Sequence, residues 1–148
     1  MLFQKKKSRK KLLLEEKLFW DKESKKNFSK VLRIKKKSFI RRLKKKSIWW
    51  HNYMPPLHNK IILDVCCGVE DNYIPYLVLS ENKLVGVDLS SDAIKINKLI
   101  LDKLGIKSII ANPNRLINIH KIFNKKKSLK TILVVANAEN LPFKKKQF

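Results

Sequence analysis

The sequence has 148 residues, of which 44% are hydrophobic, and its 35 Lys and Arg outnumber 12 Asp and Glu to give a formal net charge of +23. This length allows one domain with a hydrophobic core, and adjacent cysteines at 66 and 67 exclude a disulfide framework. No apolar run approaches the ~20 residues of a membrane span, and the first residues lack a signal-peptide pattern, so we expect a cytoplasmic protein.

The positive charge is concentrated in residues 1–50, which contain 20 Lys and Arg and 4 Asp and Glu. We expect residues 1–11 to be disordered and residues 12–46 to be helical. The apolar residues at helical spacing are Leu14, Leu18, Phe28, Leu32, Phe39 and Leu43. This basic arm suggests RNA, another polyanion or an anionic membrane surface as a partner. An ordinary helix that covers one side of the domain, or a compositional excess of lysine, explains the same pattern.

Aromatic residues follow the arm at Trp49, Trp50 and Tyr53, just before two prolines. Such a cluster can stack on bases, but we favour a hydrophobic plug packed on the domain. His51 and His58 precede the cysteines without the paired spacing of a zinc site, so no metal site is predicted.

The stretch KIILDVCCGVEDN, residues 60–72, predicts a strand, a tight turn and the start of a helix. An apolar run surrounds Asp64 and breaks at Cys66, Cys67 and Gly68. Such a turn places backbone N–H groups and the positive end of a helix dipole over a ligand, and small side chains let the backbone approach it. The stretch is therefore a candidate ligand cradle.

A second strand is predicted at residues 84–87 and ends in Asp88, twenty residues beyond Gly68. A carboxylate at this position can accept both hydroxyls of a ribose, or it can serve a turn without any ligand; we favour ribose binding. Ser90 or Ser91 then caps a helix that stops at Gly105. Its predicted buried face consists of Ala93, Ile96, Ile100 and Leu104. Alternating strands and helices imply a parallel sheet.

The charge of Asp64 helps to distinguish between cofactors. A dinucleotide would bring a pyrophosphate, which the carboxylate repels, whereas S-adenosylmethionine brings an ammonium and a sulfonium, which it attracts. The pattern G-x-G-x-x-G is also absent. A dehydrogenase-like dinucleotide binder is therefore disfavoured.

The third core strand has two candidates, Ile109–Asn112 and Thr131–Asn137. We choose the second, because the sequence LPF follows it at Leu141. Residues 106–130 then form a long connection with a helix over Arg115–Phe123.

The segments ILDVCCGVE, VGVDLSSDAIKIN and ANAENLPFKKKQF resemble the first three cofactor motifs of class I S-adenosylmethionine-dependent methyltransferases. The resemblance covers residues 60–148. It implies that Asp64, Cys66, Cys67 and Gly68 line the methionine end of the cofactor, that Asp88 and Leu89 form the ribose site, and that Asn137 and Ala138 meet the adenine edge. Two departures are Glu70, where the family usually has a glycine, and Asn137, where it usually has Asp.

We therefore expect an α/β protein: a Rossmann-like parallel sheet, the first half of a class I methyltransferase fold, over residues 51–148, preceded by the basic helical arm of residues 1–50. The chain ends where the family continues into its fourth strand, so we expect a truncated sequence, or a half that needs a partner, with its first strand at an edge of the sheet. The expected function is methyl transfer to a small-molecule or RNA acceptor, with no assignable catalytic base. The alternative is a non-catalytic basic RNA-binding protein with a degenerate Rossmann-like half.

Overall fold

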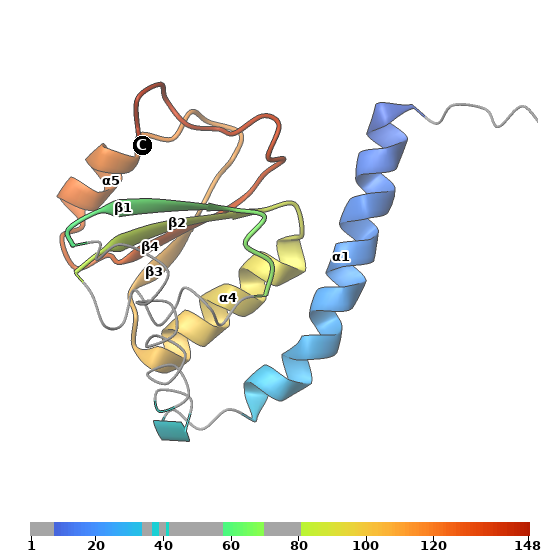
Figure 1. The fold of residues 1–148 in the computed structure, drawn as a ribbon, viewed down its shortest axis with the longest axis horizontal. Coiled ribbons are helices and arrows are strands. Elements are labelled where there is room, and N and C mark those ends of the chain that lie inside the picture. The colour runs from blue at the N-terminus through green and yellow to red at the C-terminus, as the bar shows by residue number, and fades with distance from the viewer. Residues whose placement is uncertain (1–7, 34–36, 39–40, 42–57, 70–80) are drawn as a thin grey trace, which may run out of the picture.

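The computed structural model describes residues 8–33, 37–38, 41, 58–69 and 81–148. Within them a four-stranded sheet has the order β1-β2-β4-β3, and every neighbouring pair is parallel. The strands are β1 (Ile61–Val65), β2 (Lys83–Asp88), β3 (Ser108–Ala111) and β4 (Thr131–Val135). With its helices, the sheet forms an α/β arrangement consistent with a Rossmann-like fold (Figure 1).

The central strands β2 and β4 are continuous apolar runs that are buried along most of their length, as expected for parallel strands covered on both faces. β4 lies beside β2, which confirms residues 131–137 as the third core strand. Residues 108–111 also form a strand, on the far side of β4. The segment between residues 106 and 130 is therefore part of the sheet, not merely a long connection. β1 is an outer strand of the described sheet, as predicted.

The helix expected over Arg115–Phe123 is shifted along the chain, because α5 spans Ile119–Lys125. Ile117 forms a parallel bridge with Phe143, and its N–H donates to the carbonyl of Pro142. These contacts require an extended backbone before α5. Asn118 then caps the helix by accepting from the Lys121 N–H at 2.9 Å.

Helix α4 (Ser91–Leu104) follows β2 with the boundaries that the sequence predicted. The Ser90 side chain accepts from the N–H of Ala93, and Gly105 ends the helix in the left-handed conformation at φ 77°. The predicted inner face is confirmed, since Ala93, Ile96, Ile100 and Leu104 are all buried. Local capping residues thus determine where α4 begins and ends.

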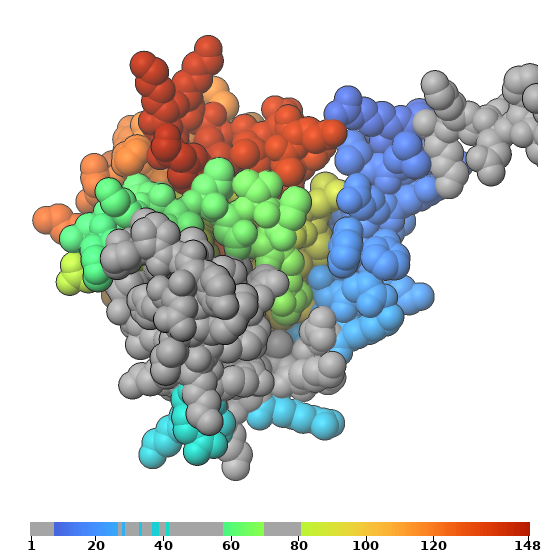
Figure 2. All heavy atoms as spheres, viewed as in Figure 1, coloured from blue at the N-terminus to red at the C-terminus, as the bar shows by residue number. Residues whose placement is uncertain are grey.

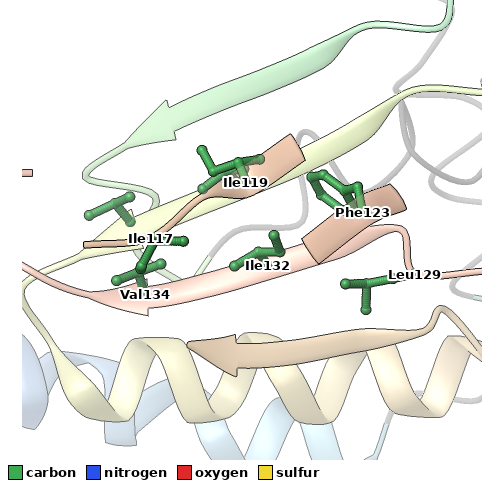
Figure 3. Packing of buried hydrophobic residues seen from close by; sticks show 8 residues of the cluster. Ile117, Ile119, Phe123, Leu129, Ile132 and Val134 are labelled. Atoms are coloured by element: carbon green, nitrogen blue, oxygen red, sulfur yellow. The ribbon is translucent and has the colours of Figure 1, made fainter. Parts of the chain in front are cut away.

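The two faces of the sheet carry different helices, α4 on one and α5 on the other (Figure 1). On the α4 face, residues of the helix pack with Cys67 and Leu133. On the α5 face, Phe123 and Ile119 point onto Ile132 and Val134 of β4, and Leu129 and Ile117 close the cluster at its ends (Figure 3). Burial on both faces explains why the strands lack polar alternation.

Helix α1 (Arg9–Leu32) stands beside the edge of the sheet near the start of α4 (Figure 1). The prediction of disorder is wrong for residues 9–11, which are helical. The apolar residues at helical spacing do not pack on the domain where their side chains are described: Leu14, Leu18 and Phe28 are exposed. Asp21 and Ser24 are buried instead, because α1 packs against the polar N-terminus of α4.

Several predictions fall outside the described residues: the aromatic cluster at 49–53, the face residues Phe39 and Leu43, and the short helix after Gly68. Among the helices that are described, none has both the length and the apolar character that crossing a membrane requires.

Candidate functional site at the carboxyl edge of the sheet

The turns that follow β1, β2 and β4 meet at the carboxyl edge of the sheet, where ligands bind in open α/β folds. The N–H of Gly68 donates to Asp88 Oδ2 at 2.7 Å, which joins the first turn to the second. The N–H of Ala136 donates to the carbonyl of Asp88 at 2.9 Å, which joins the third segment to the second. The three sequence segments that predicted the site are therefore adjacent in space.

The turn after β1 has a left-handed backbone at Cys66, with φ 60°, and at Gly68, with φ 53°. A Cβ atom built on Gly68 would meet no other atom within 4 Å. A ligand can therefore approach the backbone closely at this point. Cys66 is exposed, whereas the Cys67 side chain is 1% exposed and packs in the core beneath the turn.

Asn97 holds this turn from below, a role that was not predicted from the sequence. Its side-chain N–H donates to the carbonyl of Gly68 at 2.6 Å, and Nδ2 lies 3.8 Å from Cys67 Sγ. Asn97 is fully buried on the inner face of α4, between Ile96 and Ile100 in the helical pattern. A polar residue on an otherwise apolar helix face is the signal that would have identified it.

Asp88 has a structural role in the turn after β1 that the sequence did not predict. Oδ2 accepts from the N–H of Gly68, and Oδ1 accepts from the N–H of Ser90 at 2.7 Å. The carboxylate therefore fixes both its own turn and the turn after β1. Each carboxylate oxygen can accept a second hydrogen bond, so these contacts leave capacity for ribose hydroxyls. Leu89, beside it, is half-buried.

The electrostatic environment of the site is negative. Burial raises the pKa of the Cys66 thiol, and the negative charges of Asp88, Glu16 and Asp64 raise it further. Asp64 is half-buried near the end of β1, opposite Gly86 of β2. Glu16 belongs to α1, so the helix contributes to the same field. Although the chain has a formal net charge of +23, these carboxylates make this edge suited to a cationic group.

The segment after β4 is closed on itself by short-range hydrogen bonds. Asn137 Oδ1 accepts from the N–H of Glu139 at 3.1 Å, and Asn137 Nδ2 donates to Glu139 Oε2 at 3.1 Å. Ala138, at the tip of this turn, is exposed. The Asn137 oxygen keeps one lone pair for an adenine amino group.

Helix α1 contacts both sides of this edge. At its start, Arg9 forms an ion pair with Glu139, in the turn after β4. Figure 2 shows the start of α1 against the segment that follows β4. Twelve residues later, Asp21 Oδ1 accepts from the Ser90 hydroxyl at 2.6 Å and from the Asp92 N–H at 3.1 Å. The helix thus bridges the turns after β2 and β4.

Asp21 remains ionised in this contact. Burial opposes its charge, but Lys17, Ser90 and the Asp92 N–H outweigh burial and lower the pKa of Asp21 to about 2. The spacing of Lys17 and Asp21, four residues apart on a helix, is a sequence signal for an ion pair, although not for its position in the fold.

No group of three or more His, Cys, Asp or Glu suited to a metal ion occurs among the described residues. No family model, curated protein or solved structure matches the chain.

Proposed function

We propose that this chain is the cofactor-binding portion of an S-adenosylmethionine-dependent methyltransferase. The observation that carries the proposal is the open turn at Gly68, tied to Asp88 at the carboxyl edge of a parallel sheet. The three methyltransferase-like segments meet there. The proposal rests on these residues and not on the type of sheet, which hosts many activities.

The residues at this edge fit the chemical groups of the cofactor. Asp64 and the negative field around Cys66 attract an ammonium and a sulfonium. Gly68 leaves space for the methionine end, Asp88 can accept from the ribose hydroxyls, and Asn137 can accept from the adenine amino group. When bound, the cofactor supplies an electrophilic methyl group on sulfur.

The protein's own contribution is positioning. Asn97 and Asp88 fix the turn at Gly68 through hydrogen bonds of 2.6 and 2.7 Å, and a fixed turn orients a ligand before reaction. Arg9 and Asp21 place α1 along the same edge. The acceptor that we propose is a small molecule or RNA, and no residue is assigned as catalytic base.

A second candidate function is favoured by the charge. The basic arm of residues 1–50 carries 20 Lys and Arg and 4 Asp and Glu, and an arm of this kind binds RNA through its phosphates. In this alternative the chain is a non-catalytic RNA-binding protein, and the carboxyl edge holds no cofactor.

Calorimetric titration of the full chain with S-adenosylmethionine tests the proposal, with NAD as the control ligand. We compare Gly68→Ala with Gly105→Ala, because both glycines have positive φ and both substitutions cost about 1 kcal/mol of backbone strain. Only Gly68 lies in the candidate site. We expect binding of S-adenosylmethionine alone, weakened about tenfold or more by Gly68→Ala and unchanged by Gly105→Ala.

Two results would reject the proposal. A protein that is folded by circular dichroism but binds neither ligand would favour the RNA-binding alternative. Equal weakening by the two alanine variants would show that strain, and not obstruction of the turn, affects binding, and would remove Gly68 from the site.

A further inference from the structure

The opposite edge of the sheet, where the strands begin, has a row of lysines. Lys83 is the first residue of β2, Lys107 directly precedes β3, and Lys130 directly precedes β4. Their backbones lie side by side: the N–H of Lys130 donates to the carbonyl of Lys107 at 2.9 Å, and the carbonyl of Lys130 accepts from the N–H of Leu84. Neighbouring strands are about 4.8 Å apart, so the three residues form one closely spaced row.

The strand register directs these three side chains to the same face. Leu84 and Ser108 both pair with Thr131, so Lys83, Lys130 and Lys107 occupy equivalent positions on adjacent strands. Side chains at equivalent positions in a sheet point to one face. That face is the one covered by α5, because Lys83 Nζ lies 4.9 Å from the centre of the Phe123 ring.

The C-terminal end of α5 adds three more lysines at this place. Lys125 ends the helix, and Lys126 and Lys127 follow it. Together with Lys107, these residues line an open pocket of about 710 Å³. Ser128 also lines it, and its hydroxyl accepts from Lys107 Nζ at 3.3 Å. The C-terminal end of α5 and the starts of β3 and β4 lie at the end of the sheet away from α1 (Figure 1).

The positive charge of this pocket is not neutralised within the described residues. Asp102 is the one carboxylate in the lining, and it forms an ion pair with Lys98. No ion pair between a carboxylate and any of the six lysines is found in the part of the chain that the structure describes. Cations near a helix C-terminus are favourable by themselves, which accounts for Lys125 and Lys126. It does not account for a row of three lysines on adjacent strands.

We propose that this amino-edge pocket binds the phosphate backbone of a nucleic acid strand. Like charges on neighbouring strands repel one another, and successive phosphates neutralise them with release of counterions. Lysine acts on phosphate as a point charge without base preference, so we expect binding independent of sequence. None of the described lining residues belongs to α1, and the site does not depend on cofactor binding at the carboxyl edge.

The test is fluorescence anisotropy of the full chain with a labelled single-stranded RNA of about 20 nucleotides, between about 50 and 200 mM salt. The test variant is the triple substitution Lys107→Gln, Lys126→Gln and Lys127→Gln. The control is Lys144→Gln, Lys145→Gln and Lys146→Gln, which removes the same charge from exposed positions that belong neither to the pocket nor to the basic arm. Replacing the same three pocket lysines with Arg keeps the charge and checks that loss is not due to misfolding.

We expect the pocket Gln variant to bind the RNA about 10- to 100-fold more weakly. The slope of log affinity against log salt concentration should become shallower by about 2, because each lost phosphate contact with a single strand removes about 0.7. The control variant at residues 144–146 is expected to lose less than about threefold, and the Arg variant to bind as the wild type does. Equal losses in pocket and control variants would overturn the proposal in favour of diffuse attraction. The proposal would also be overturned if the pocket Gln variant lost binding to vesicles with anionic lipid while its RNA binding was unchanged. That result would indicate that the pocket binds a membrane surface instead.

Discussion

Replacing Asp21 with Asn tests whether one buried carboxylate holds α1 against α4. Asp21 is 9% exposed and accepts from the Ser90 hydroxyl and the Asp92 N–H. Burial opposes its charge, but Lys17 and these donors lower its pKa from 3.8 to about 2. At 1.36 kcal/mol per pKa unit this corresponds to about 2 kcal/mol. Solvent at the margin of the contact screens part of this electrostatic stabilisation, so we expect Asp21→Asn to lower the free energy of unfolding by about 1–2 kcal/mol at pH 7.

The sign of the pH dependence follows from the lowered pKa. The pKa of Asp21 in the folded protein, about 2, lies below its ordinary value of 3.8, so the stabilisation is complete above about pH 5. It falls to about half near pH 3 and is lost as the pH falls through the folded value. The difference between wild type and Asp21→Asn should therefore shrink in the same range.

Hydrogen exchange followed by mass spectrometry measures the contact directly. We expect amides of α1 to exchange about 5- to 30-fold faster in Asp21→Asn, with β4 unchanged. Asp102→Asn is the matched control, since Asp102 also pairs with a lysine four residues away but has a half-exposed side chain. It should change exchange by no more than about twofold. The role of Asp21 would be refuted if the α1 amides of Asp21→Asn exchanged at the wild-type rate, or if Asp102→Asn accelerated their exchange equally.

Two further predictions concern the cysteines and a buried hydroxyl. Because Cys66 is exposed and its pKa is raised, iodoacetamide should label it more slowly than free cysteine at pH 8, and the labelling rate should still be increasing above pH 9. Cys67 is buried and should react only after unfolding. Preferential labelling of Cys67, observed by mass spectrometry, would contradict this prediction. Thr131 Oγ1 is buried and has no hydrogen-bond partner among the described residues, so Thr131→Val should stabilise the protein by about 1 kcal/mol in urea unfolding. A loss of stability would mean that the hydroxyl has a partner in solution.

The parts of the fold that depend on neighbouring residues could be predicted from the sequence. The boundaries of α4 follow from Ser90 and Gly105, whose capping roles need no distant contact. The turn after β1 was recognisable because Gly68 and the preceding apolar run are local signals. The start of α5 was predicted too early, because the extended backbone at Ile117 depends on Pro142 and Phe143, far along the chain.

In the candidate site, the sequence placed Gly68 and Asp88 in two separate turns, and the structure joins them through a hydrogen bond of 2.7 Å. The support from Asn97 was not predicted, because a single polar residue on a helix face does not reveal which backbone group it meets. The same holds for the amino-edge lysines: each one is unremarkable in the sequence, and only the strand order makes Lys83, Lys130 and Lys107 neighbours.

The sequence by itself determined β1, β2 and β4, the capped helix α4, the small-residue turn at Gly68 and the basic character of the first third of the chain, since these depend on composition and on residues close together in the chain. The tertiary structure alone decided that α1 packs through Asp21 while Leu14 and Leu18 remain exposed. The physical reason is that the chemical groups offered by the neighbouring element decide which face of a helix becomes buried. The start of α4 offers N–H groups and the Ser90 hydroxyl, and a carboxylate satisfies them where an apolar side chain cannot.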